Sequence, residues 1–284
     1  MADKVQKNIE VRNIIGNNLF YLLSALLILV YLPALIDLVT DWYQDPNYSH
    51  GFLVPLISGF LIWKKRKELA DIQCESSGWG IFLIAVGMIL FILGNGATEY
   101  FTVRFSLVVT IFGLALYLLG RPAVSKIWFA LLFLVFLIPI PYVLYFSIAF
   151  PLQLLASKVT SVILNLIGMT VVRQGNIINL PNQTLEVAEA CSGMRSLVSI
   201  LALGAIYAYM TQKRAPGKII LFLSTIPIAV LGNIFRVFVT ALIVYTTDAN
   251  VTDEPVHSIM GASVFVVAII LLFITGAILR RLFK

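Results

Sequence analysis

Apolar runs of about twenty residues recur along this chain, and they constrain its fold more than any other feature of the sequence. An α-helix rises roughly 1.5 Å per residue, so each run is long enough to cross a hydrocarbon core of roughly 30 Å. Hydrophobic residues make up 60% of the 284 residues and charged residues only 12%. A soluble domain carries about twice that charged share. The sequence therefore predicts an all-α polytopic membrane protein.

The net charge of +6 comes from short basic clusters between the apolar runs. This distribution is typical of cytoplasmic membrane loops, because translocated loops are poor in Lys and Arg. We therefore expect membrane lipid, and no nucleic acid, as a partner. The clusters are Lys4, Lys7 and Arg12; 64–67 (KKRK); Arg121 and Lys126; Lys213, Arg214 and Lys218; and Arg280, Arg281 and Lys284.

A path of about eight crossings puts these basic clusters on the cytoplasmic side of the membrane. The same path places both termini in the cytoplasm. Residues 149–169 are assigned differently, because their apolar side chains share one helical face and polar ones lie largely opposite. That pattern favours an amphipathic helix in the outer interface, with a ninth crossing as the alternative. The predicted crossings are 19–39, 48–63, 78–94, 102–119, 124–146, 193–211, 217–246 and 257–279.

Residues 170–190 form a predicted outer loop that leads into Cys191. The stretch NIINL-PNQ-TLEVA within it indicates two short extended runs around a Pro-Asn turn, a β-hairpin-like segment. No soluble second domain and no clear internal repeat is evident. We therefore predict that residues 1–284 form a single integral-membrane domain.

Arg236 is the most unusual charge, because it lies inside the apolar run 217–246. A charge in a membrane span is costly unless it faces a partner or a wet cavity, so it marks a candidate functional site. Counted from Lys218, Arg236 lies about 27 Å along the helix, near the outer surface. Asn233, one turn earlier on the same face, is placed to orient its guanidinium.

Cys191 precedes Ser192, a plausible helix N-cap, and Arg195 follows in the next turn. A helix N-terminus and a nearby cation both favour the thiolate, which is the nucleophilic form. The alternatives are a small buried hydrophobe and a disulfide. The only other cysteine, Cys74, lies beside the inner basic cluster 64–67 and cannot reach across the bilayer.

His50 and His257 are the only histidines, and both begin predicted crossings at the outer surface. The residues alone do not decide which one carries protons, and His257 also suits a simple interfacial anchor. A thiolate, a histidine and an arginine at one depth suit acyl transfer. A membrane acyltransferase without a thiol and a transporter or polysaccharide-export component are the alternatives. Neither HExxH nor GxGxxG occurs, so we expect no metal or other cofactor.

Four separated motifs resemble the exosortases, integral-membrane cysteine transpeptidases of the exosortase/archaeosortase group. They are DPNYSHGFLVPLISGFLIWKKR, GNIINLPNQTLEVAEACSGMRS, GNIFRVF and HSIMG, and the resemblance runs from about residue 42 to 265. It implies that Cys191 is the nucleophile that forms a thioacyl-enzyme. It also implies that Arg236 is the catalytic arginine and that His257 is the acid/base that protonates the leaving amine.

The resemblance further implies supporting roles for Arg195 and Asn233. His50, in the first motif, is a candidate substrate contact, with a helix cap as its alternative role. The implied substrates are exported proteins with a C-terminal sorting signal of the PEP-CTERM kind: a Pro-Glu-Pro-like motif, a transmembrane helix and a basic tail. The implied location is the bacterial inner membrane with the active site facing the periplasm. The acceptor of the cleaved chain cannot be read from the sequence.

Overall fold

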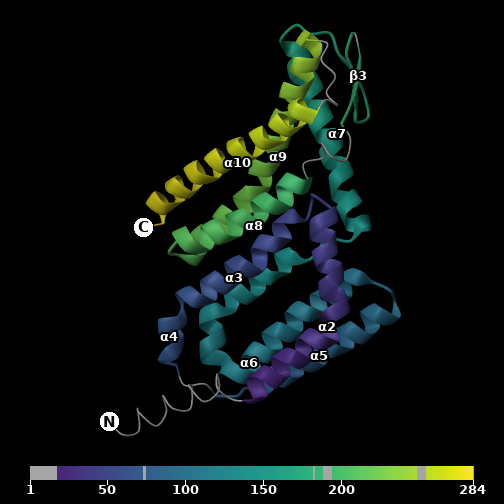
Figure 1. The fold of residues 1–284 in the computed structure, drawn as a ribbon. Helices are drawn as coiled ribbons and strands as arrows, with labels where there is room; N and C mark the ends of the chain where they lie inside the picture. The colour runs from purple at the N-terminus through teal and green to yellow at the C-terminus, as the bar shows by residue number, and fades with distance from the viewer. Residues whose placement is uncertain (1–17, 73–74, 182, 188–193, 248–253, 284) are drawn as a thin grey trace. The chain divides into compact units, whose positions relative to one another are not determined.

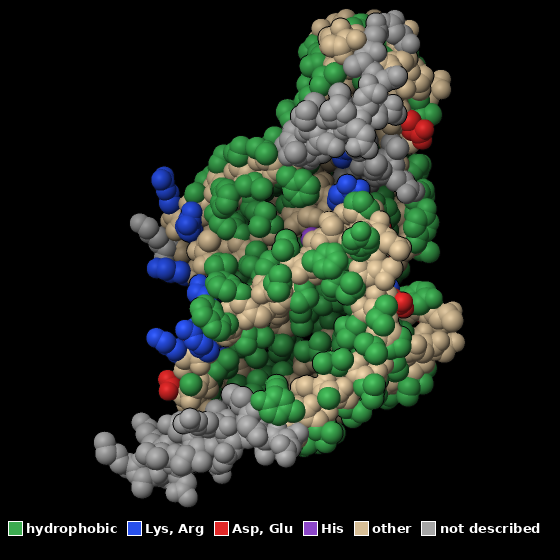
Figure 2. All heavy atoms as spheres, in the orientation of Figure 1, with side chains coloured by type: hydrophobic (Ala, Val, Ile, Leu, Met, Phe, Trp, Pro, Cys, Tyr) green, Lys and Arg blue, Asp and Glu red, His purple; other side chains and the backbone are tan. Residues whose placement is uncertain are grey.

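The computed structural model describes residues 18–72, 75–181, 183–187, 194–247 and 254–283, with backbone alone for 18 and 254–263. The chain divides into two compact units, Met1–Ile140 and Pro141–Lys284. Among the described residues, seven helices are long and apolar enough to cross a membrane, which confirms a polytopic all-helical protein. Many large hydrophobic side chains are exposed, and they cover much of the face drawn in Figure 2, as expected where lipid is the solvent.

The described residues of the first unit form helices joined by short turns, and α6 contacts α2, α3, α4 and α5 (Figure 1). Its helix α6 bends at Gly120, whose φ of 77° lies in the left-handed region that favours glycine. The α6 helix therefore has two arms. The elements are α2 (Asn18–Gln44), η1 (Ser49–Phe52), α3 (Leu53–Lys64), α4 (Arg66–Ala70), α5 (Gly78–Gly96), α6 (Tyr100–Phe133) and η2 (Leu134–Leu137).

Close packing of α5 on α6 depends on glycines seven residues apart along α5. A Cβ at Gly80 would collide with the backbone of Tyr117 on α6, and Gly87 and Gly94 are buried in the same contact. The α2 helix joins this pair through Tyr31, whose side chain is fully buried. Lipid tails are as apolar as the side chains, so the hydrophobic effect does not drive helices together in a membrane. Helix association there depends on close packing, and small residues let the helix backbones approach closely.

The second unit combines four helices with a small antiparallel sheet of order β1-β2-β3 (Figure 1). Ile178 of β2 pairs with both outer strands and packs with Leu164 and Ala241 in one buried cluster. The elements are α7 (Tyr142–Leu166), β1 (Val172–Gln174), β2 (Ile177–Asn179), β3 (Thr184–Glu186), α8 (Met194–Thr211), α9 (Ala215–Thr247) and α10 (Glu254–Leu282).

The structure confirms the two extended runs around the Pro-Asn turn as β2 and β3, and it adds β1, which the sequence analysis missed. The predicted crossing 124–146 is divided in the structure. The second arm of α6 ends at Phe133, and α7 begins at Tyr142. Pro139 and Pro141 fall in the break, where their missing N–H groups and restricted neighbours stop a helix.

Residues 149–169 were predicted as a separate interfacial helix. In the structure, residues 149–166 belong to the continuous helix α7, which ends at Leu166. By length and composition α7 is itself one of the candidate spans, so its orientation in the bilayer stays a prediction. The predicted crossing 48–63 is a 3-10 turn followed by α3, which has 12 residues and is shorter than a typical span. The sidedness of both termini likewise stays a prediction.

Candidate functional site

The buried residues of α9 before and after Arg236 belong to two different hydrophobic clusters. Arg236 lies 21 residues after Ala215, so the part of α9 before it is about 32 Å long, close to the thickness of a hydrocarbon core. In that part, Leu221 and Ala229 pack with residues of α8 and α10. Beyond Arg236, α9 packs against α7 and the small sheet. Arg236 itself is half-buried.

The N-terminus of α8 lies level with Arg236. Gly204 of α8 packs against Thr225 of α9, and Leu197 and Asn233 border one cavity, so these pairs define an antiparallel register. Continuing this register to the first residue of α8 brings Met194 beside Arg236. The N-terminus of a helix carries partial positive charge, which favours an anion such as a thiolate.

Cys191 lies three residues before α8, outside the described residues. The described residues on either side of the segment that carries Cys191 are nonetheless buried. Val187 is buried in the cluster shared by the sheet and α9, and its N–H donates to the Asn176 carbonyl at 3.0 Å. Met194, on the other side, is also buried. The sheet therefore anchors the approach to Cys191 beside α9.

His257 lies in the first turn of α10, and its side chain is outside the described residues. The backbone register of α10 against α9 is set by Gly232, which packs against Val264 and Ala268. Continuing that antiparallel register places the backbone of His257 about one to two helical turns beyond the level of Arg236. The beginning of α10 thus reaches the same region as the beginning of α8.

The two predicted supporting residues differ in their surroundings. Arg195 is exposed in the first turn of α8. Asn233 is buried, with 3% of its surface exposed, and its Oδ1 accepts no hydrogen bond from the described residues. It faces a cavity of about 10 Å³ with otherwise apolar walls, which include Leu152 and Ile234. The Asn233 oxygen therefore does not accept a hydrogen bond from the Arg236 guanidinium, so a role in orienting that group stays a prediction.

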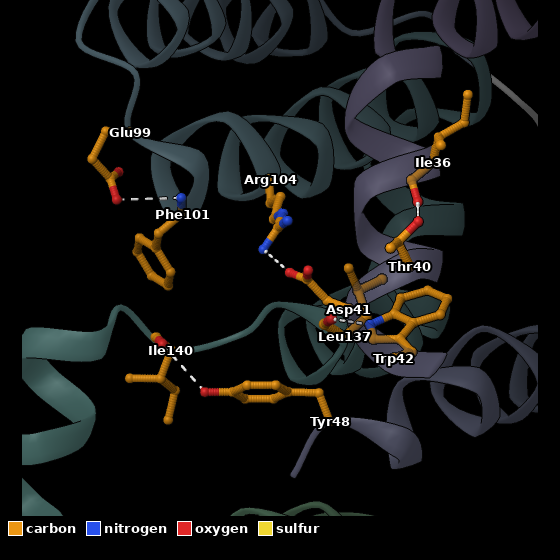
Figure 3. Close-up of polar contacts among 10 residues, drawn as sticks. All are labelled: Ile36, Thr40, Asp41, Trp42, Tyr48, Glu99, Phe101, Arg104, Leu137 and Ile140. Atoms are coloured by element: carbon orange, nitrogen blue, oxygen red, sulfur yellow. Dashed lines mark hydrogen bonds and ion pairs between the residues drawn. The ribbon is translucent and has the colours of Figure 1, made fainter. Parts of the chain in front are cut away.

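His50 belongs to the first unit, in the 3-10 turn η1. The Trp42 indole lies over Gly51 and donates to the Leu137 carbonyl at 2.9 Å, which fixes η1 against η2 (Figure 3). The His50 Nδ1 is buried and has no partner among the described residues. Burial lowers the pKa of His50, although the carbonyls of Phe136 and Asn47 act in the opposite direction.

The sequence analysis did not assign a role to Arg104, which is buried and forms an ion pair with Asp41 at 2.7 Å (Figure 3). In the sequence, the feature that could have indicated a role for Arg104 was its position outside the basic clusters. No set of three or more described His, Cys, Asp and Glu side chains is arranged to hold a metal ion. The expectation of no cofactor stays a prediction.

Comparison with protein-family models shows a match to the family described as transmembrane exosortase (Exosortase_EpsH), over residues 42–274. Searches of curated proteins and of solved structures gave no significant match. The matched range includes all six residues proposed for the site from the sequence: His50, Cys191, Arg195, Asn233, Arg236 and His257. Because the match covers most of the 284 residues, the chain belongs to the transmembrane exosortase family.

Proposed function

We propose that this chain is a membrane-embedded cysteine transpeptidase that cleaves C-terminal sorting signals at the outer face of the bacterial inner membrane. The match to the exosortase family over residues 42–274 carries the proposal, because membership implies a transpeptidase that processes sorting signals. The substrate class that we propose is an exported protein with a Pro-Glu-Pro-like motif, a transmembrane helix and a basic tail.

The proposed chemistry uses three side chains of the second unit. The Cys191 thiolate attacks the carbonyl carbon of the scissile peptide bond, and Arg236 donates hydrogen bonds to the oxyanion that forms. The C–N bond then breaks, the leaving amine takes a proton from His257, and a thioacyl-enzyme remains. An acceptor amine or water attacks the thioester, gives its proton to His257 and releases the Cys191 thiolate.

Backbone registers in the second unit support this assignment. Met194, the first residue of α8, lies level with Arg236 of α9, and the backbone of His257 on α10 lies about one to two helical turns beyond that level. Arg236 also lies about one hydrocarbon thickness from the beginning of α9. A substrate helix in the bilayer would present the residues just outside its span at such a level.

Co-expression with a substrate carrying a Pro-Glu-Pro-type signal tests the proposal. The wild type should shorten the substrate on a gel, Cys191→Ala should leave it intact, and mass spectrometry should locate the cut near the motif. Cys74→Ala is the matched control and should behave as the wild type. Equal amounts of each variant in the membrane fraction show that the chain is inserted.

Trapping of the intermediate separates thiol chemistry from the alternatives. Hydroxylamine attacks thioesters, so wild-type membranes should release a C-terminal hydroxamate of the substrate, and Cys191→Ala membranes should not. An acyltransferase that works through a histidine would keep its activity without the thiol. Cleavage by both Cys191→Ala and the wild type would therefore contradict the mechanism.

A further inference from the structure

The first unit contains a cavity whose lining carries both signs of charge. Its volume for water-sized molecules is about 70 Å³, several times the roughly 10–15 Å³ that one water needs. Asp37 of α2, Phe91 and Asn95 of α5, and Tyr100 and Arg104 of α6 line it. These helices belong to candidate membrane spans, so the cavity opens where lipid is the surrounding solvent.

Arg104 supplies the positive side of the cavity. Only 7% of its surface is exposed, and its Nη1 lies 2.7 Å from Asp41 Oδ2 (Figure 3). Asp41 is its only ion-pair partner among the described residues. A guanidinium has five N–H donors in a planar fork, so one carboxylate contact leaves donors for another anionic oxygen.

Asp37 supplies the negative side, one helical turn before Asp41 on α2. It is exposed and forms no ion pair with any other described residue. A carboxylate within an apolar span is costly without a partner, and the neighbouring Arg104 is already paired with Asp41. The ring of Phe91 borders the same space, and aromatic faces attract cations. The Tyr100 ring also borders it, but the Arg104 guanidinium already lies 5.8 Å from the centroid of that ring. Asp37 and Phe91 together suit an ammonium group.

The cavity also lies at a suitable depth for a lipid headgroup. Arg104 is four residues after the first residue of α6, so it lies about 6 Å below the turn that joins α5 to α6. Large apolar side chains of α2 and α5 are exposed below this level, including Leu29, Ile36 and Ile92. They provide an apolar surface along which acyl chains can pack.

We propose that this cavity binds the headgroup of phosphatidylethanolamine. The lipid phosphate accepts hydrogen bonds from the N–H donors of Arg104 that Asp41 does not use, and the ammonium group donates to Asp37 beside the Phe91 ring. Phosphatidylcholine has no N–H to donate to Asp37, and phosphatidylglycerol has no cation. The binding is independent of the cleavage reaction, since no residue of the cavity takes part in it.

Native mass spectrometry of the full purified chain tests this site with three lipids of identical acyl chains: phosphatidylethanolamine, phosphatidylcholine and phosphatidylglycerol. The wild type should prefer phosphatidylethanolamine. Asp37→Asn should weaken phosphatidylethanolamine binding about tenfold, because the acceptor of the ammonium hydrogen bond loses its negative charge. Phosphatidylcholine, whose cation makes no such hydrogen bond, should lose less, and phosphatidylglycerol, which has no cation, should be unchanged. Asp37 is exposed, so this variant should remain folded. Glu75→Gln removes another exposed carboxylate of the same unit and should bind as the wild type does.

Three results would overturn the proposal. One is equal binding of the three lipids by the wild type. Another is an equal loss of all three lipids in Asp37→Asn, which would indicate general damage to the surface. The third is binding of soluble glycerophosphoethanolamine as tightly as of the lipid, which would identify a free amino-phosphate compound as the ligand. A tenfold loss of phosphatidylethanolamine binding with phosphatidylglycerol binding unchanged, absent in Glu75→Gln, supports the headgroup site.

Discussion

The contact between Gly204 and Thr225 holds α8 against α9, so Gly204→Ala should disturb both stability and the level of the α8 N-terminus. A Cβ at Gly204 would collide with Cγ2 of Thr225, a fully buried side chain whose hydroxyl donates to the Phe222 carbonyl. Overpacking of this kind costs roughly 1–3 kcal/mol. The better helix propensity of alanine returns up to about 1 kcal/mol. We therefore expect a net loss of about 1–2 kcal/mol in the free energy of unfolding.

Thr225→Ser gives a direct test, because it removes the colliding methyl group and keeps the hydroxyl. The new Cβ would then have Thr225 Cβ at 3.2 Å and Oγ1 at 3.6 Å as its nearest neighbours, a tight but tolerable contact. The double variant Gly204→Ala/Thr225→Ser should therefore recover most of the loss. The expected coupling between the two sites is on the order of 1 kcal/mol.

Unfolding of the purified chain in mixed micelles, followed by far-UV circular dichroism as the dodecyl sulfate fraction rises, measures these differences. Gly59→Ala on α3 is the matched control, because no atom lies within 4 Å of the new Cβ. Substrate processing by the same variants reports on the level of the α8 N-terminus, and it should fall in Gly204→Ala and return in the double variant. Strictly additive effects of the two substitutions would refute the packing argument.

Three further predictions concern the first unit, each measured in the same unfolding assay. Tyr31→Phe removes a buried hydroxyl that lies 2.9 and 3.0 Å from two hydroxyls of α6, and it should destabilise the chain by about 1 kcal/mol; an unchanged transition would mean that α6 satisfies those hydroxyls alone. Arg104→Ala leaves Asp41 without its cation, so adding Asp41→Asn should restore part of the lost stability; a double variant less stable than the single one would contradict this. The lowered pKa of His50 means that the unfolded chain binds its proton more readily than the folded chain, so stability should be full above about pH 6.5 and decrease as the pH falls below it. His50→Gln should flatten that decrease, and an identical pH profile in the variant would show that another group is responsible.

The helices were predictable because the apolar pattern that predicts them is repeated in every turn. The positions where one helix ends and the next begins depend instead on a few residues. The apolar runs predicted the spans, and the Pro-Asn turn predicted β2 and β3. The break between η2 and α7 was misplaced, because prolines occur within membrane helices as well as between them. The structure shows both cases, since Pro33 and Pro151 lie inside helices and Pro139 lies in the break.

The candidate site was predictable as a set of chemical groups but not as an arrangement. Arg236 was evident because a charge within an apolar run is costly, and the helical rise predicts its depth. The levels of the α8 and α10 N-termini depend instead on where Gly204 and Gly232 meet their neighbours. Arg104 was visible as a cation outside the clusters, but its pairing with Asp41 joins helices far apart in the sequence. No local pattern encodes such contacts.

The buried residues of α9 before and after Arg236 belong to two different hydrophobic clusters. Those before it cluster with α8 and α10, and those after it cluster with α7 and the sheet. Val187, at the end of the sheet, and Met194, at the beginning of α8, are both buried, and residues 188–193 connect them. Fixing both ends of a short segment reduces the conformational entropy that it has left to lose. The proposed nucleophile Cys191 lies within that segment, so the sheet, though small, would contribute to catalysis by holding the segment beside Arg236.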